Sequence, residues 1–62
     1  MILEKIKFLC KEHNTSIPKL ETELGFGAGT IYKWDEVSPS VHYLKKVADY
    51  FGCTVDELLK PV

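Results

Sequence analysis

Apolar residues recur three and four positions apart along almost the whole chain, and no segment alternates apolar and polar residues. The first spacing places apolar side chains on one face of an α-helix, whereas strict alternation is typical of a half-buried strand. The sequence therefore predicts an all-α fold. A chain of 62 residues is long enough for one domain only, so we expect a single domain over residues 1–62.

Capping and stop residues divide the apolar pattern into separate helices. Ser16 can cap the second helix and Gly25 ends it. The fourth begins near Ser38 or Ser40, either of which could be its cap, and the fifth opens on a capping box at Thr54. The five expected helices cover residues 2–13, 17–24, 28–34, 40–51 and 55–59.

The composition excludes several classes of protein. No apolar run approaches the ~18 residues of a membrane span, and residues 1–5 lack the layout of a signal peptide, so we expect a cytoplasmic protein. Cys10 and Cys53 lie in apolar surroundings and are expected to be free thiols. No cysteines have zinc-ligand spacing, and His13 and His42 are isolated, so no metal, cofactor or small-molecule ligand is expected.

The net charge of −1 argues against a protein that holds nucleic acid by charge alone. All eight basic residues are lysines, and the chain has neither arginine nor glutamine. If the chain binds DNA, we expect a shallow salt dependence, with roughly two to four phosphates neutralised per monomer.

The pair of short helices around Gly25 is the most informative unit. A helix of about eight residues, a glycine-led turn and a second short helix form the geometry that enters the major groove of DNA. The first helix would lie across the DNA backbone. The second, from Gly27 to Trp34, would present its N-terminal half to the base edges. The alternative is a helical bundle in which the same apolar residues are simply core.

Three stretches resemble the phage-repressor helix-turn-helix family, also called Cro/C1-type or XRE: residues 16–34 (SIPKLETELGFGAGTIYKW), 44–51 (LKKVADYF) and 54–59 (TVDELL). The resemblance covers nearly the whole chain and implies a compact five-helix, lambda-repressor-like domain with the helix-turn-helix at its second and third helices. It also implies a bacterial or phage transcription regulator, such as a repressor, that binds a double-stranded DNA operator as a homodimer.

The chain departs from the usual pattern of this family at three places. Glu21 stands where many members have alanine, at the close contact between the two motif helices. Ile17 stands where a phosphate-contacting glutamine is common. Gly27, Ala28 and Gly29 occupy the start of the recognition helix, where relatives usually carry serine, glutamine or asparagine.

We expect the exposed positions of the recognition helix to contact bases. Lys33 can donate to guanine O6 and N7, Tyr32 can hydrogen-bond a base edge or pack on a thymine methyl, and Ala28 can touch a thymine methyl. Gly29 is the fourth expected base contact. The expected phosphate contacts are Ser16, Lys19, Gly27 and Thr30.

Gly27 and Gly29 admit two interpretations. Their missing side chains could let the helix start approach DNA closely, so that free N–H groups meet a phosphate. Alternatively, Gly27 only caps the helix, and Gly29 lowers its stability by ~1 kcal/mol relative to alanine. The sequence leaves both interpretations open.

A second functional hypothesis is a protein-interaction module that keeps the fold and has lost strong DNA affinity. The acidic balance and the Gly-Ala-Gly helix start favour it. Phe8, Tyr43 and Tyr50 are the aromatic residues that could form a dimer or partner contact. We reject an enzymatic function because the sequence shows no paired carboxylates near a plausible cleft and no convergent Ser/His/Asp or Cys/His set. A chain this short also leaves little room for a pocket of ~300 Å³.

Overall fold

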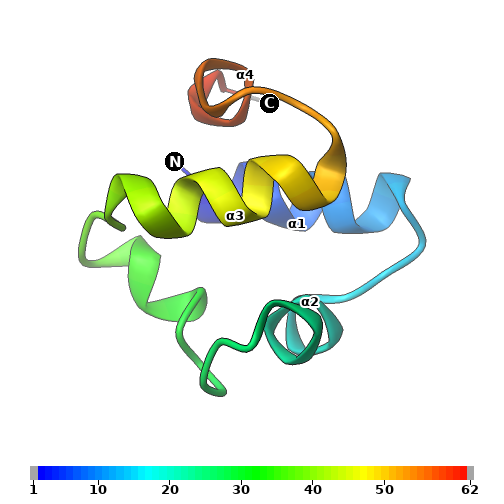
Figure 1. Ribbon diagram of the computed structural model, residues 1–62, viewed down its shortest axis with the longest axis vertical. Coiled ribbons are helices and arrows are strands. Elements are labelled where there is room, and N and C mark those ends of the chain that lie inside the picture. The colour runs from blue at the N-terminus through cyan, green and yellow to red at the C-terminus, as the bar shows by residue number, and fades with distance from the viewer. Residues whose placement is uncertain (1, 62) are drawn as a thin grey trace.

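A computed structural model describes residues 2–61, which form four α-helices and one short 3-10 helix (Figure 1). The elements are α1 (Ile2–Glu12), α2 (Ile17–Leu24), the 3-10 helix η1 (Tyr32–Asp35), α3 (Val41–Phe51) and α4 (Val55–Leu59). No residue among 2–61 is in a strand, so the predicted all-α class is confirmed, whereas the prediction of five α-helices is wrong. Met1 and Val62, which the expected domain includes, lie outside the described residues.

The third expected helix, over 28–34, is replaced by a turn followed by η1. Gly29 has a φ of +86°, a left-handed value that an α-helix does not contain. The N–H of Thr30 donates to the carbonyl oxygen of Gly27, three residues back, at 3.1 Å. The glycine-rich start therefore produces tight turns instead of an α-helix.

The helices α2, α3 and α4 each begin after an N-cap residue. Ser16 Oγ accepts the N–H of Lys19 at 3.3 Å, and Thr54 Oγ1 accepts the N–H of Glu57 at 3.0 Å. Of the two serines that could begin the fourth expected helix, Ser40 is the cap of α3, with extended backbone and no side-chain capping bond. The side chains of Ser16 and Thr54 satisfy part of the backbone N–H groups that a helix start leaves without partners.

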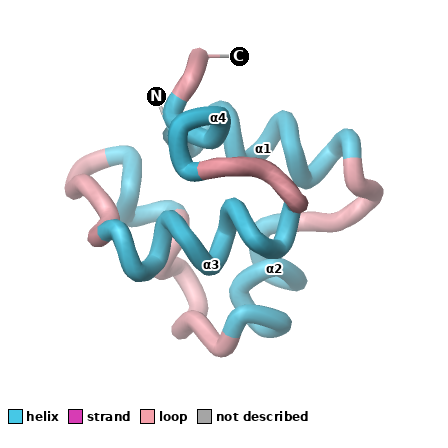
Figure 2. Tube along the Cα trace, turned by 45° about the horizontal axis from the view of Figure 1, so that its top comes forward, coloured by secondary structure: helices cyan, strands magenta, loops and turns pink. Residues whose placement is uncertain are grey.

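α1 is central to the packing of the helices. It contacts α2, α4 and η1, and α4 also contacts α3 (Figures 1 and 2). The first and last helices of the described chain are therefore joined through one core. The buried apolar residues are Leu3, Ile6, Cys10, Ile17, Leu20, Ile31, Trp34, Leu44, Val47, Ala48, Phe51 and Leu58.

Two side chains of α1 show how much of this helix is covered. Lys5 is 8% exposed and is one of the buried charged residues. Cys10 lies in the core, where burial raises the pKa of its thiol. Cys10 and Cys53 are both free thiols, and a thiol held protonated by burial reacts slowly.

Residues 2–61 contain neither a membrane-spanning helix nor a cluster of metal ligands. None of the helices there is long and apolar enough to cross a membrane. No group of three or more His, Cys, Asp or Glu side chains in the same range is arranged to hold a metal ion.

Replacing Leu20 by alanine should destabilise the fold strongly. The Leu20 side chain on α2 is fully buried, and removing a buried leucine side chain costs about 2–5 kcal/mol. We expect a loss of this size in urea unfolding followed by circular dichroism. Leu59→Ala is the control and should have a small effect, because Leu59 is 56% exposed. Equal losses of stability in the two variants would contradict the burial pattern.

Candidate nucleic-acid interface

Buried residues hold α2 and η1 on the same core. Leu20 of α2, Ile31 of the turn and Trp34 of η1 are all buried. α2 ends at Leu24 and is capped by Gly25, which has a φ of +74°. The chain then turns to reach η1, which lies to the left of α2 in Figure 1. We call residues 27–35 the recognition segment, because they occupy the place of the expected recognition helix.

A buried carboxylate joins α2 to the recognition segment. Glu21 is only 4% exposed. Its Oε1 accepts the N–H of Gly29 at 3.2 Å, and its Oε2 accepts the N–H of Ile31 at 2.9 Å. Hydrogen bonds to an ionised acceptor are roughly twice as strong as neutral ones, so the two bonds offset the cost of burying the charge. The departure from the family's usual alanine therefore makes the contact between the two motif segments.

Sequence reasoning missed this role of Glu21, although the sequence contained a signal for it. Glu21 comes four residues after Ile17 and three before Leu24, which places it on the buried face of α2. A carboxylate on a buried face needs hydrogen-bond donors. The glycine-rich turn that follows supplies backbone N–H groups as donors.

The two glycines of the recognition segment differ in conformation. Gly29 has a φ of +86° and donates its N–H to Glu21, so its role is conformational. The interpretation that its N–H is free for a phosphate is wrong. Gly27 is not among the glycines with positive φ, and a Cβ there would meet Thr30 Oγ1 at 3.6 Å, an ordinary contact.

The expected DNA contacts reach the surface to different degrees. Ala28, Tyr32 and Lys33 are exposed, and Gly29 is half-buried. The hydroxyl of Ser16 accepts a backbone N–H at the start of α2 and still has its own hydrogen to donate. Among the expected phosphate contacts, Ser16, Lys19 and Gly27 are exposed and Thr30 is half-buried.

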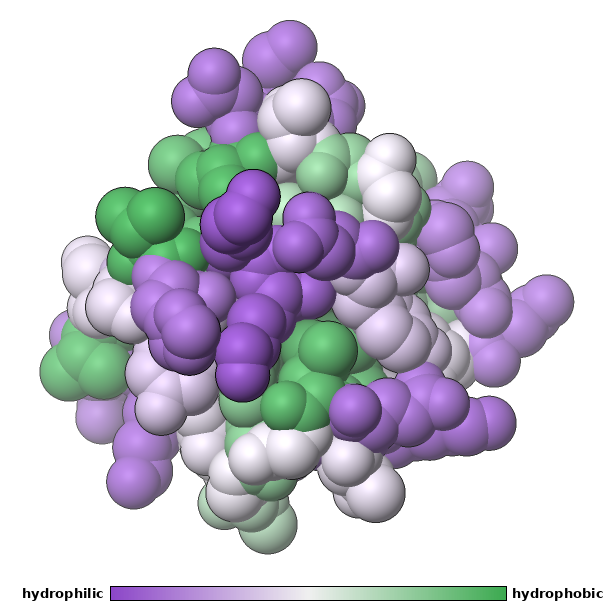
Figure 3. Space-filling model, viewed as in Figure 1, coloured by the Kyte–Doolittle hydropathy of each residue, from purple (hydrophilic) through white to green (hydrophobic). Residues whose placement is uncertain are grey.

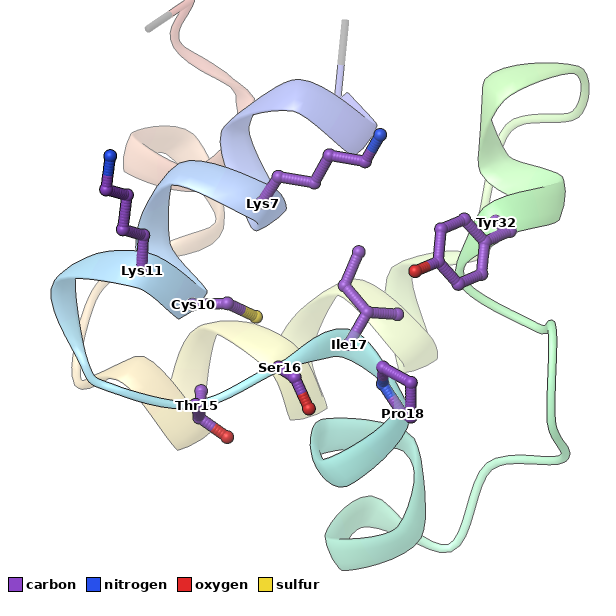
Figure 4. Close-up of a pocket in the computed structure, with 8 residues that line it drawn as sticks. All are labelled: Lys7, Cys10, Lys11, Thr15, Ser16, Ile17, Pro18 and Tyr32. Atoms are coloured by element: carbon purple, nitrogen blue, oxygen red, sulfur yellow. The ribbon is translucent and has the colours of Figure 1, made fainter.

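The hydroxyl of Tyr32 is directed toward an open groove of about 400 Å³ between α1, η1 and the start of α2 (Figure 4). The expectation that so short a chain has little room for such a volume is therefore wrong. Lys7 extends across the groove toward Tyr32, whereas Lys11 lines the groove with its ammonium end pointing away from it (Figure 4). The groove brings two expected contacts, Ser16 and Tyr32, together with two lysines that the sequence analysis did not assign to the site. It is lined by Lys7, Cys10, Lys11, Thr15, Ser16, Ile17, Pro18 and Tyr32.

The aromatic residues considered for a partner contact are partly engaged within the fold. Tyr43 packs edge-on against Phe26, with ring centroids 4.9 Å apart, and remains 39% exposed. Phe8 is 42% exposed. The Tyr50 hydroxyl donates to Glu23 Oε2 at 2.6 Å, and this hydrogen bond raises the pKa of Tyr50. Tyr50 is therefore an internal contact between α2 and α3.

A domain in which two short helical segments meet across a glycine turn on one core has the organisation of a helix-turn-helix protein. Over residues 5–62 the chain matches the family of Cro/C1-type HTH DNA-binding domains, and it belongs to that family. The predicted family is thereby confirmed. No curated protein and no solved structure matches the chain.

Gly29→Ala tests the conformation of the turn. An L-residue held in the left-handed region loses roughly 1–2 kcal/mol, and a Cβ at Gly29 would have nothing within 4 Å, so the whole cost is conformational. We expect a loss of this size in thermal or urea unfolding. Gly27→Ala is the matched control and should change stability by less than about 0.5 kcal/mol. If Gly29→Ala were no more destabilising than Gly27→Ala, the turn would not have the conformation described.

Proposed function

We propose that the chain is a sequence-specific DNA-binding transcription regulator, a cytoplasmic repressor that places its recognition segment in the major groove of an operator. The observation that carries this proposal is the pair of exposed neighbours Tyr32 and Lys33 on η1. They stand in the second half of a helix-turn-helix unit, the part that meets base edges in such proteins. Membership of a DNA-binding family supports the same conclusion.

Among the proposed base contacts, Lys33 has the greatest power to discriminate one base from another. Its ammonium group can donate to guanine O6 and N7, and a good contact of this kind contributes roughly 1–3 kcal/mol of discrimination. Ala28 can add a contact with a thymine methyl, and Gly29 allows close approach of the backbone. Tyr32 lies at the border of the groove, so its hydroxyl can reach either a base edge or a phosphate.

Side chains must supply most of the phosphate contacts around α2. Pro18 has no N–H, and the N–H of Lys19 is donated to Ser16, so the start of α2 has few backbone donors left. Lysine side chains can supply the missing positive charge. The proposed phosphate contacts are Ser16, Lys19, Gly27 and Thr30, together with Lys7 and Lys11, which line the same groove as Ser16.

A homodimer on a two-fold operator fits the small number of cations. With eight lysines and a net charge of −1, a single domain neutralises few phosphates and should bind weakly. Two linked domains convert the second binding event into an intramolecular one, which raises the overall affinity without new contacts. Two-fold symmetry is also the commonest arrangement of small oligomers.

The second candidate function is a protein-interaction module. The observation in its favour is that η1 is a short 3-10 helix with a single lysine, which offers little to read a base sequence. Against it, the face that carries α3 shows apolar groups as separate patches among hydrophilic ones (Figure 3). That face lacks the continuous apolar surface that usually marks a protein contact.

Selection of binding sites from a random pool of DNA duplexes at about 100 mM salt, a low-salt condition that favours binding, tests the proposed function. We expect a two-fold motif with half-sites about one helical turn apart. Lys33→Ala should relax the preference at one position in each half-site, with Lys46→Ala, on the exposed face of α3, as control. A folded protein that enriches no sequence would favour the interaction module.

The salt dependence of DNA binding tests the lysines of the groove separately. Lys7→Ala should weaken binding to all duplexes alike and lower the slope of log K against log salt by about one. Lys45→Ala removes the same charge from the exposed face of α3 and should leave the slope unchanged. Equal changes for the two variants would mean that Lys7 contributes only to net charge.

A further inference from the structure

We infer that Glu21 is a positioning residue for DNA recognition: its carboxylate fixes the recognition segment and thereby the place of Lys33. This inference rests on the proposed function, since it assigns Lys33 a base to contact. Both oxygens of Glu21 are in use, one toward Gly29 and the other toward Ile31. Ile31 directly precedes the exposed pair Tyr32 and Lys33, so the path of the chain into η1 is set at this residue.

The recognition segment needs an external acceptor because its own backbone does not supply one. In an α-helix that began at residue 27, the N–H of Ile31 would donate to the Gly27 carbonyl oxygen. That oxygen instead accepts the N–H of Thr30 at 3.1 Å. The Ile31 N–H is buried and donates to Glu21 at 2.9 Å. A buried N–H without an acceptor is strongly unfavourable. The Glu21 carboxylate therefore replaces the carbonyl oxygen that would accept this N–H in an α-helix.

The carboxylate is itself held in place by the core. Leu20 precedes Glu21 on α2 and is fully buried, as is Ile31 on the other side of the contact. The two bonds therefore connect Glu21 to backbone groups eight and ten residues further along the chain. Both sides of this contact are anchored in the core. Direct contact between Glu21 and DNA is excluded, because the side chain is almost fully buried and its negative charge would repel phosphate.

Glutamine is the discriminating substitution at this position. Glu21→Gln keeps the shape of the side chain, but it has one acceptor oxygen, and its NH2 group would face one of the two N–H donors. Glu23→Gln is the matched control, because it makes the same chemical change two residues along α2. Glu23 accepts from Tyr50 and has no bond to the recognition segment among residues 2–61.

The first measurement is amide hydrogen exchange by NMR in the free protein. We expect Glu21→Gln to speed the exchange of the Gly29 and Ile31 amides by about tenfold or more, as the loss of hydrogen bonds to a charged acceptor implies. Amides of α3 should be unchanged, and Glu23→Gln should not affect Gly29 or Ile31. Unchanged exchange at both amides in Glu21→Gln would overturn the inference.

The second measurement is a double-mutant cycle with Lys33→Ala, using the DNA duplex that the wild-type protein selects. Lys33→Ala should weaken binding by roughly 5- to 100-fold in the wild-type background. In the Glu21→Gln background it should cost at least about fivefold less, because the lysine is no longer held over its base. Glu21 and Lys33 share no contact, so a merely stabilising Glu21 would give additive effects, and additivity would overturn the inference.

The two measurements separate failure of this inference from failure of the proposed function. If the wild-type protein binds no duplex, or if Lys33→Ala has no effect, the proposed function fails, and exchange at Gly29 and Ile31 alone decides whether Glu21 fixes the segment. If Glu21→Gln does not fold, Glu21→Asp replaces it in both measurements, because aspartate keeps the charge but is too short to reach both N–H groups.

Discussion

The bonds from the Gly29 and Ile31 N–H groups to the Glu21 carboxylate determine the shape of the surface proposed to meet DNA. Both donors belong to the backbone, so the bonds fix the path of the chain and not merely one side chain. Ile31 and Trp34 then hold the following residues against the core. The recognition segment is therefore positioned by tertiary contacts, although the same part of a helix-turn-helix protein is ordinarily positioned by its own helical hydrogen bonding.

Local signals account for most of the helical architecture. Ser16 and Thr54 accept the backbone N–H groups that a sequence-based capping rule assigns to them, and apolar spacing indicates which faces are buried. The third helix was predicted wrongly because both interpretations of Gly29 placed this glycine inside a helix. Its left-handed conformation is stabilised by Glu21, eight residues earlier. The spacing of apolar residues does not reveal a contact that forms only when two segments meet.

The site could be predicted only in part, for the same reason. The exposure of Ala28, Tyr32 and Lys33 agrees with their place on the outer side of the motif. The groove could not be predicted, because the proximity of Lys7 to Tyr32 depends on the packing of α1 against η1. Lys5 is buried because α1 contacts three other elements, so more of its circumference is covered than a single apolar stripe suggests.

A recognition segment this short limits how a monomer can discriminate between DNA sequences. In a 3-10 helix, residues three apart lie on the same side, so Tyr32 shares its side of η1 with Asp35, while Trp34 is buried. Lys33 is then the only cation of the segment, and Asp35 is repelled by phosphate. Such repulsion adds no affinity, but it disfavours orientations of the segment that bring Asp35 toward the DNA backbone. In the proposed homodimer, few base contacts, an orientation restricted by charge, and repetition on the second subunit would together give the specificity that one such segment lacks.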